Sequence, residues 1–100
     1  MASQHKKVGG MIDPQKATEE VQGYVDQVKT SVEDAVGRTL EKYEAKVYST
    51  QLVNGTNYFV KIDTGGGKFV HVRLHKSFQG QISYSNCQDA KTETDALEYF

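Results

Sequence analysis

The sequence predicts an α+β fold in which one long α-helix packs on an antiparallel β-sheet of four to five strands. Two observations lead to this prediction. Apolar residues recur at helical spacing between positions 18 and 37, and at every second position in several stretches after position 43. A helix and a sheet that each have one apolar face can bury those faces against each other. A length of 100 residues suits one domain.

We expect the chain to divide into a short tail and that domain. Residues 1–8 are polar and short of apolar groups, so we interpret them as a mobile N-terminal tail, and residues 9–100 as the single domain. Met11-Ile12 is a brief apolar segment that ends at Asp13-Pro14. Because proline disfavours a helical conformation in the preceding residue, this segment is predicted to be a strand.

The predicted helix begins after Thr18, whose hydroxyl can cap it, and stops at Gly37. Glu19 and Glu20 suit the positive end of the helix dipole. The residues of the apolar stripe are Val21, Tyr24, Val25, Val28, Val32, Ala35 and Val36. Such a stripe needs a partner layer to cover it.

Strands are predicted at residues 43–53, 56–64 and 68–76, with a weaker one at 81–87 and an irregular return through 96–100. Asn54-Gly55 is a strong signal for a two-residue hairpin turn, because both residues tolerate a positive φ. The inward face of the first strand is ambiguous. A strict two-residue loop puts Val47 opposite Ile62 and leaves Tyr48 on the other face.

Alternation in the third strand predicts one buried and one solvated face. The apolar positions are Val70, Val72 and Leu74. The intervening positions, His71, Arg73 and His75, are expected to face water.

Composition excludes several function classes. The net charge is −1 and the basic residues are dispersed, which argues against nucleic acid or an anionic membrane as a partner. The chain has no bilayer-spanning apolar run and no secretory signal, and its single cysteine, Cys87, cannot form an intramolecular disulfide, so a cytoplasmic location is expected. Cys87 with His71 or His75 is a poor candidate for a nucleophile and base, and the two histidines lack a third metal ligand. We therefore predict no enzyme activity, metal or cofactor.

One stretch of the sequence is unusual for a turn. In Gln51-Leu52-Val53-Asn54-Gly55 an apolar pair sits directly before the turn, where exposure is expected. Apolar residues at such a place are costly in water but suit a hydrophobic cleft in a partner.

This stretch matches the QxVxG motif of the cystatins, and its continuation, Thr56-Asn57-Tyr58-Phe59-Val60-Lys61, resembles that of the stefins, the cytoplasmic type 1 cystatins. The likeness covers the chain after its first eight residues. It includes Gly9-Gly10, Ala17-Thr18, Val25-Asp26-Gln27-Val28-Lys29, Phe69-Val70-His71 and Ala96-Leu97-Glu98-Tyr99-Phe100.

The resemblance implies a cystatin-like fold and a reversible, tight-binding inhibitor of papain-like cysteine proteases, which include the lysosomal cathepsins. It also implies that three segments form a wedge that blocks the protease cleft. The protease-binding residues would be Val8, Gly9 and Gly10 in the first segment, Gln51, Leu52, Val53, Asn54 and Gly55 in the second, and Ser77, Phe78 and Gln79 in the third.

The third segment departs from the family pattern. Stefins commonly have Leu-Pro there, whereas this chain has Phe78-Gln79, which keeps an apolar group and loses the proline. A core position for Phe78 remains an alternative, as does a simple hinge at Gly9-Gly10. The alternative function is a cystatin-fold interaction module with weak or lost inhibition. We expect a monomer, with domain-swapped dimerisation, a habit of the family, left open.

Overall fold

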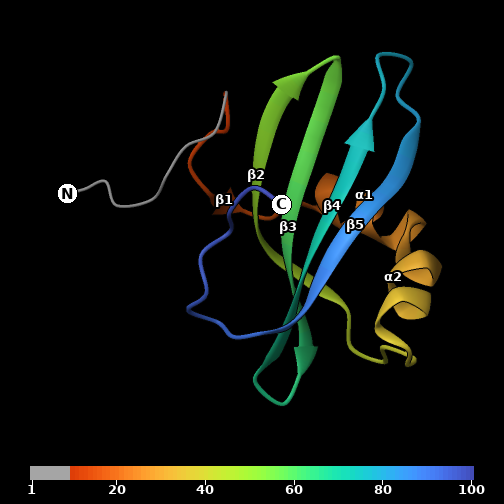
Figure 1. Cartoon of the computed structure of the whole chain (residues 1–100), viewed down its shortest axis with the longest axis vertical. Helices are drawn as coiled ribbons and strands as arrows, with labels where there is room; N and C mark the ends of the chain where they lie inside the picture. The colour runs from red at the N-terminus through yellow and green to blue at the C-terminus, as the bar shows by residue number, and fades with distance from the viewer. Residues whose placement is uncertain (1–9) are drawn as a thin grey trace.

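A computed structural model describes residues 10–100 of the chain. These residues form one antiparallel sheet with the strand order β1-β2-β3-β4-β5, and two helices (Figure 1). The strands are β1 (Gln15–Lys16), β2 (Glu44–Val53), β3 (Gly55–Gly65), β4 (Lys68–Lys76) and β5 (Ile82–Lys91), and the helices are α1 (Glu19–Gln27) and α2 (Lys29–Val36). The predicted α+β class is confirmed. Neither helix combines the length and the hydropathy that crossing a bilayer would need.

Both predicted ends of the helical region are confirmed. The Oγ1 atom of Thr18 accepts a hydrogen bond of 3.2 Å from the backbone N–H of Val21, which satisfies one donor of the first turn. At the other end Gly37 has a φ of 79° and its N–H donates to the carbonyl of Glu33. A residue without a side chain suits this left-handed conformation.

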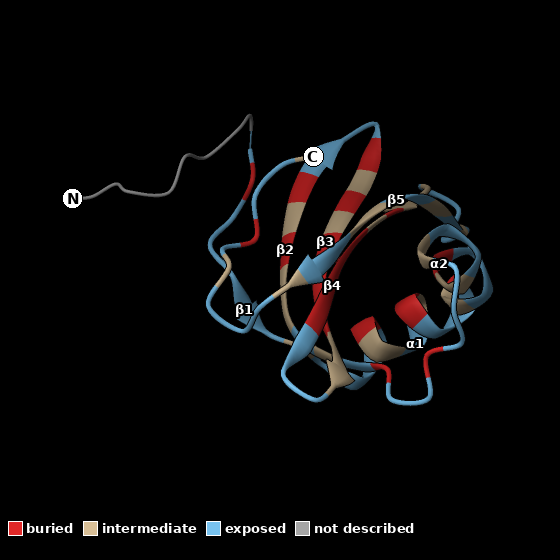
Figure 2. Ribbon diagram, turned by 60° about the horizontal axis from the view of Figure 1, so that its bottom comes forward, coloured by how far each residue is buried: buried red, intermediate tan, exposed pale blue. Residues whose placement is uncertain are grey.

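The prediction of one continuous helix is wrong at Val28. The N–H of this residue bonds the carbonyl of Val25, three positions back, at 3.2 Å, and regular bonding resumes where Val32 donates to Val28. The tighter turn separates α1 from α2. All three valines are nonetheless buried, and Figure 2 shows both helices beside the same face of the curved sheet.

The main core lies between the helices and the sheet. Its buried sheet residues come mainly from β3, the middle strand of the five, and from its neighbour β4. The buried members of this core are Val21, Val25, Val28, Val32, Leu40, Tyr43, Val60, Ile62, Val70, Val72 and Leu74. The periodicity in β4 therefore predicts its helix-facing residues correctly.

The register of β2 differs from the one that a strict two-residue loop would give. Val47 pairs with Lys61, because Asn54 alone separates the paired residues Val53 and Gly55. Ala45 pairs with Ile62, because the register shifts between Ala45 and Val47. Tyr48 pairs with Val60 and packs against the main core. The inward face of β2 is thus the one that carries Tyr48.

The opposite side of the sheet, here called the outer face, is covered rather than solvated. Phe59 is fully buried there and forms a second cluster with Met11 and Leu97. Its ring lies 5.7 Å from that of Phe100, measured between centroids. Figure 1 shows the C-terminal segment after β5 crossing the sheet on the side away from the helices.

This cover makes one expectation wrong. The outer-face residues of β4 were expected to be solvated, but His71 is fully buried and the other two are partly buried. Arg73 donates to the carbonyl of Phe100, and its guanidinium lies over the rings of Phe59 and Tyr99. The irregular segments near the two ends of the described chain cover this face with apolar residues, and the sequence of β4 alone does not predict that cover.

The first strand also lies elsewhere than predicted. Met11 forms only an isolated bridge with Gln51, and the two-residue β1 follows Pro14. At the other end of the sheet β5 runs to Lys91, four residues beyond the predicted end.

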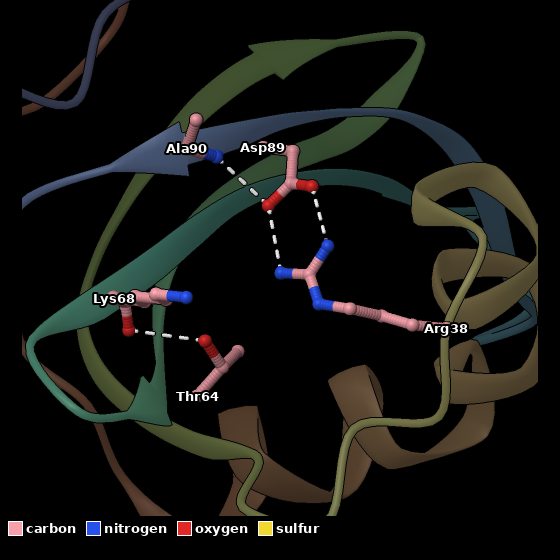
Figure 3. A network of polar contacts seen from close by, with 5 residues as sticks. All are labelled: Arg38, Thr64, Lys68, Asp89 and Ala90. Carbon is pink, nitrogen blue, oxygen red and sulfur yellow. Dashed lines mark hydrogen bonds and ion pairs between the residues drawn. The ribbon is translucent and has the colours of Figure 1, made fainter.

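An ion pair joins the connection after α2 to the edge strand β5. Arg38 donates to both carboxylate oxygens of Asp89, at 2.7 and 3.1 Å (Figure 3). This bond, more than any other contact, holds the pKa of Asp89 below its usual range. In the same view the hydroxyl of Thr64 bonds the carbonyl of Lys68 across the β3–β4 turn.

Candidate functional site

The β2–β3 hairpin exposes the apolar pair that the sequence singled out. Leu52 is 74% exposed and Val53 is 41% exposed, although both belong to β2. Only Asn54 separates the paired residues Val53 and Gly55, so the turn is tight. The strands behind it hold these two side chains in place at the end of the sheet.

Gln51 behaves differently from its two neighbours. It is 7% exposed, and its Oε1 accepts a hydrogen bond of 3.1 Å from the side-chain amide of Asn57. The Oδ1 of Asn57 in turn lies 3.1 Å from Nδ1 of His75. These three residues are aligned across β2, β3 and β4. Gln51 therefore supports the hairpin from below, and its side chain is not displayed with Leu52.

Sequence reasoning missed Asn57 and His75 as parts of this support. The signal was available in the strand register, since Asn57 lies opposite Gln51 and His75 opposite Asn57. Directly opposed residues on one face of an antiparallel sheet interact. A two-residue loop would place Gln51 opposite Tyr58, so the tighter turn at Asn54 hid this relationship from the sequence.

Gly55 brings the hairpin close to β4. Its φ is 95°, and a Cβ atom added there would lie 2.6 Å from the carbonyl oxygen of Lys76 and 2.7 Å from Nε2 of His75. No side chain fits that space without movement. A glycine is thus required at this position for both its conformation and its close approach.

The turn after β4 exposes a second apolar group. Phe78 is 77% exposed, which rules out the core position considered for it. The turn lacks the proline of the stefin pattern, yet Ser77 ties it closed. The Ser77 N–H donates to the carbonyl of Gln81 at 2.9 Å, and its Oγ accepts from the Gln81 N–H at 3.0 Å. Gln79 at the tip is exposed.

A third segment lies beside the first hairpin. Gly10 has a φ of 79°, and a Cβ there would come within 3.8 Å of the backbone oxygen of Leu52. The N–H of Ile12 then donates to the carbonyl of Thr50. Val8 and Gly9, the other two residues expected in this segment, lie outside the described residues.

A cation–aromatic cluster stands behind the second turn. The Nζ of Lys76 donates to the hydroxyl of Tyr24 at 2.7 Å, and this bond raises the pKa of Lys76. The ring of Tyr24 meets that of Tyr58 edge to face at 5.1 Å. Burial raises the pKa of Tyr58. The last residue of β4 is thereby fixed against α1.

The first hairpin and the turn after β4 lie at the same end of the sheet (Figure 1). Among residues 10–100, the exposed large apolar side chains are Ile12, Leu52, Val53, Phe78 and Tyr99. Three of these five belong to the two loops. The described part of the chain contains no group of three or more His, Cys, Asp or Glu residues suited to a metal ion. The two loops thus offer an exposed apolar contact surface at one end of the sheet.

Comparisons with known proteins agree with this picture. The sequence profile of the Cystatin domain matches residues 9–99. Cystatin-A of Mus musculus is 40% identical over 94 residues, which cover 92% of this chain and 97% of the relative. The leukocyte cysteine proteinase inhibitor 1 of Sus scrofa is 37% identical over the full length of both chains. Cystatin-B of Oplegnathus fasciatus is 39% identical over 92% of this chain and 95% of the relative.

Proposed function

Since the chain belongs to the cystatin family, a family of cysteine protease inhibitors and not of enzymes, we propose that it is a reversible, tight-binding inhibitor of papain-like proteases of the cathepsin type. The observation that carries this proposal is the exposure of Leu52 and Phe78 on two adjacent loops. A hydrophobic cleft in a protease would remove both from water.

The proposed contact surface has three parts. It consists of the N-terminal residues Val8, Gly9 and Gly10, the hairpin residues Leu52, Val53, Asn54 and Gly55, and the turn residues Ser77, Phe78 and Gln79. Gln51, which belonged to the expected set, acts in this proposal through the hairpin that it supports.

Inhibition without cleavage follows from the hairpin geometry. A protease substrate must lie extended across the catalytic residue, whereas the ends of this loop are held by the pairing of β2 with β3. The loop also loses little conformational entropy when it docks, because it is already ordered. A complex of standard size buries about 1,600 Å² in total, and nanomolar binding requires about −12 kcal/mol.

The setting of this activity is also part of the proposal. Similarity to proteins named Cystatin-A and Cystatin-B supports a stefin-type inhibitor, and we infer a cytoplasmic location and a monomeric working form from the same resemblance. The partners would be cysteine proteases of the cathepsin type.

Titration of papain tests the proposal. We expect stoichiometric inhibition that dilution reverses, with the inhibitor recovered intact, and no effect on trypsin. Leu52→Asp and Phe78→Asp should each weaken inhibition at least about tenfold, a change of about 1.4 kcal/mol. The free energy of unfolding of each variant, measured by thermal denaturation, should stay within about 0.5 kcal/mol of the parent's, because both side chains are exposed.

Lys68→Ala provides the control, since Lys68 is exposed and begins β4, at the end of that strand away from Phe78. Its inhibition should match that of the parent. Absence of papain inhibition at a large molar excess would contradict the proposal and favour the alternative function, a cystatin-fold interaction module that has lost inhibition. Equal potency of Phe78→Asp and the parent would remove the turn after β4 from the contact surface.

A further inference from the structure

A cavity of about 180 Å³ opens on the outer face, away from the two exposed loops. Its walls come from the segment around Met11, from Val47 on β2, and from the segment around Leu97. These three side chains provide an apolar lining. The volume is comparable to that of engineered cavities of about 150 Å³ that hold a benzene molecule.

Two buried polar groups line this apolar space. Ser49 is fully buried, and its Oγ has no hydrogen-bond partner among the described residues. Lys61 is 9% exposed, and its Nζ donates to the carbonyl of Glu93 at 2.6 Å. Within the described chain no carboxylate lies within 4.0 Å of that ammonium. A buried charge and a buried hydroxyl both require partners.

The carboxylates that also line the cavity do not fill this role. The Oδ2 of Asp95 accepts bonds from the N–H and the hydroxyl of Thr92, at 2.7 and 3.1 Å. These bonds hold the pKa of Asp95 below its usual range, so it is an anion near neutral pH. Asp13 lines the same cavity and makes a polar contact of its own. Two carboxylates nearby add an electrostatic cost for each negative charge on a ligand, so a single charge is favoured over several.

We propose that this cavity binds a small aliphatic monocarboxylate. Its carboxylate would accept hydrogen bonds from Nζ of Lys61 and Oγ of Ser49, and its alkyl chain would lie between Met11, Val47 and Leu97. One anionic group then satisfies the buried ammonium and the buried hydroxyl together. The chain would have about five or six carbons, from the volume of the cavity.

Titration of the full chain with sodium hexanoate near neutral pH, followed by ¹H–¹⁵N NMR, tests this assignment. Saturable shifts are expected at the amides of Val47, Ser49, Lys61 and Leu97. Hexylamine has the same tail with a positive head, and succinate has two negative charges. Neither should produce these shifts at the concentration that saturates the site with hexanoate.

Three variants separate the contributions. Lys61→Met removes the charge and should weaken hexanoate binding at least about tenfold, and Ser49→Ala should weaken it about threefold. Ala96→Leu narrows the cavity at an exposed residue, so it should reduce binding without disturbing the core, and it keeps the test valid if Lys61→Met does not fold. Lys42→Met, at a lysine that pairs with Asp63 and does not line the cavity, is the control.

Two results would overturn the proposal. One is the absence of saturable shifts with hexanoate, as a cavity that holds only water would give. The other is equal affinity of the parent and of both Ser49→Ala and Ala96→Leu for hexanoate. Papain inhibition plays no part in these measurements, so they stand apart from the proposed inhibitory function.

Discussion

The side-chain amide of Asn57 donates a hydrogen bond of 3.1 Å to Gln51, its direct partner across the β2–β3 ladder. Asn57 is 6% exposed, and its Oδ1 also meets Nδ1 of His75. The polar residue that begins the motif is thus linked through Asn57 to β4. The two apolar residues that follow it stand on this buried support.

Replacing Asn57 by alanine should loosen the hairpin. It removes one partner from Gln51 and one from His75 in a buried site, which typically costs about 1–3 kcal/mol of the free energy of unfolding. Inhibition of papain should weaken as well. Chemical denaturation and inhibition kinetics measure the two effects.

Asn86→Ala is the matched control. Asn86 lies on β5, is exposed, and bonds the N–H of Cys87 through its side chain. Its loss should leave both quantities close to those of the parent. If Asn57→Ala inhibited as well as the parent, the network would be irrelevant to the shape of the loop.

Gly55→Ala should be more harmful than the same change at Gly66. Both glycines have a positive φ, so an alanine is strained at either position. Only at Gly55 does the new Cβ also meet the backbone of Lys76, at 2.6 Å. We expect a loss of about 2 kcal/mol or more in stability and a marked loss of inhibition. At Gly66, where no atom lies within 4 Å, about 1 kcal/mol and unchanged inhibition are expected.

The burial of His71 predicts a pH dependence of stability. Desolvation, together with Lys61 and Lys91, lowers the pKa of His71 from 6.5 to about 4, and Asp95 opposes this shift. Between about pH 4 and 6.5, His71 is protonated in the unfolded chain and neutral in the folded one, so the unfolded state binds more protons. The free energy of unfolding should therefore fall as the pH decreases from about 6.5 to about 4, by on the order of 3 kcal/mol.

Denaturation curves of the parent and of His71→Leu across this range provide the measurement. The variant cannot take up the proton, so its stability should fall less steeply over the same interval. Identical slopes for the two proteins would mean that His71 does not contribute to the acid sensitivity.

Cys87→Ser should leave inhibition intact. Cys87 is half-buried on β5 and packs against the main core, on a strand that contributes no residue to the proposed contact surface. A modest loss of stability is expected from the more polar side chain. A folded variant with a large loss of inhibition would show that the contact surface extends onto β5.

The parts of the fold that the sequence predicts well are those with a regular period. The helical stripe predicts the burial of Val25 and Val32, and the alternation in β4 predicts that of Val70 and Val72. The buried face of such an element can be predicted from the spacing of its own apolar residues, provided that one other layer covers it. The exposed pair before Asn54-Gly55 could be recognised because residues next to a turn are usually polar, whereas Leu52 and Val53 are apolar.

The outer face could not be predicted in the same way. The spacing in β4 predicts a solvated His71, and Phe59 lies between Tyr58 and Val60, two of the alternating apolar residues of β3. Their burial depends on segments without a period, namely the region around Met11 and residues 92–100. Which irregular segment covers which strand is decided by long-range packing, so local spacing carries no information about it.

The N-terminal segment also determines how the sheet is closed at its edge. Hydrogen bonds from Ile12 to Thr50 and from Ala17 to Lys46, with the pairing of β1, occupy backbone groups along β2. At the opposite edge, β5 has two register irregularities against β4 and a left-handed Ala90. Bulged edges are poor templates for the addition of a foreign strand, and occupied ones offer few free groups. Backbone-mediated aggregation at this edge therefore requires residues 11–17 to detach from β2 before another molecule can take their place.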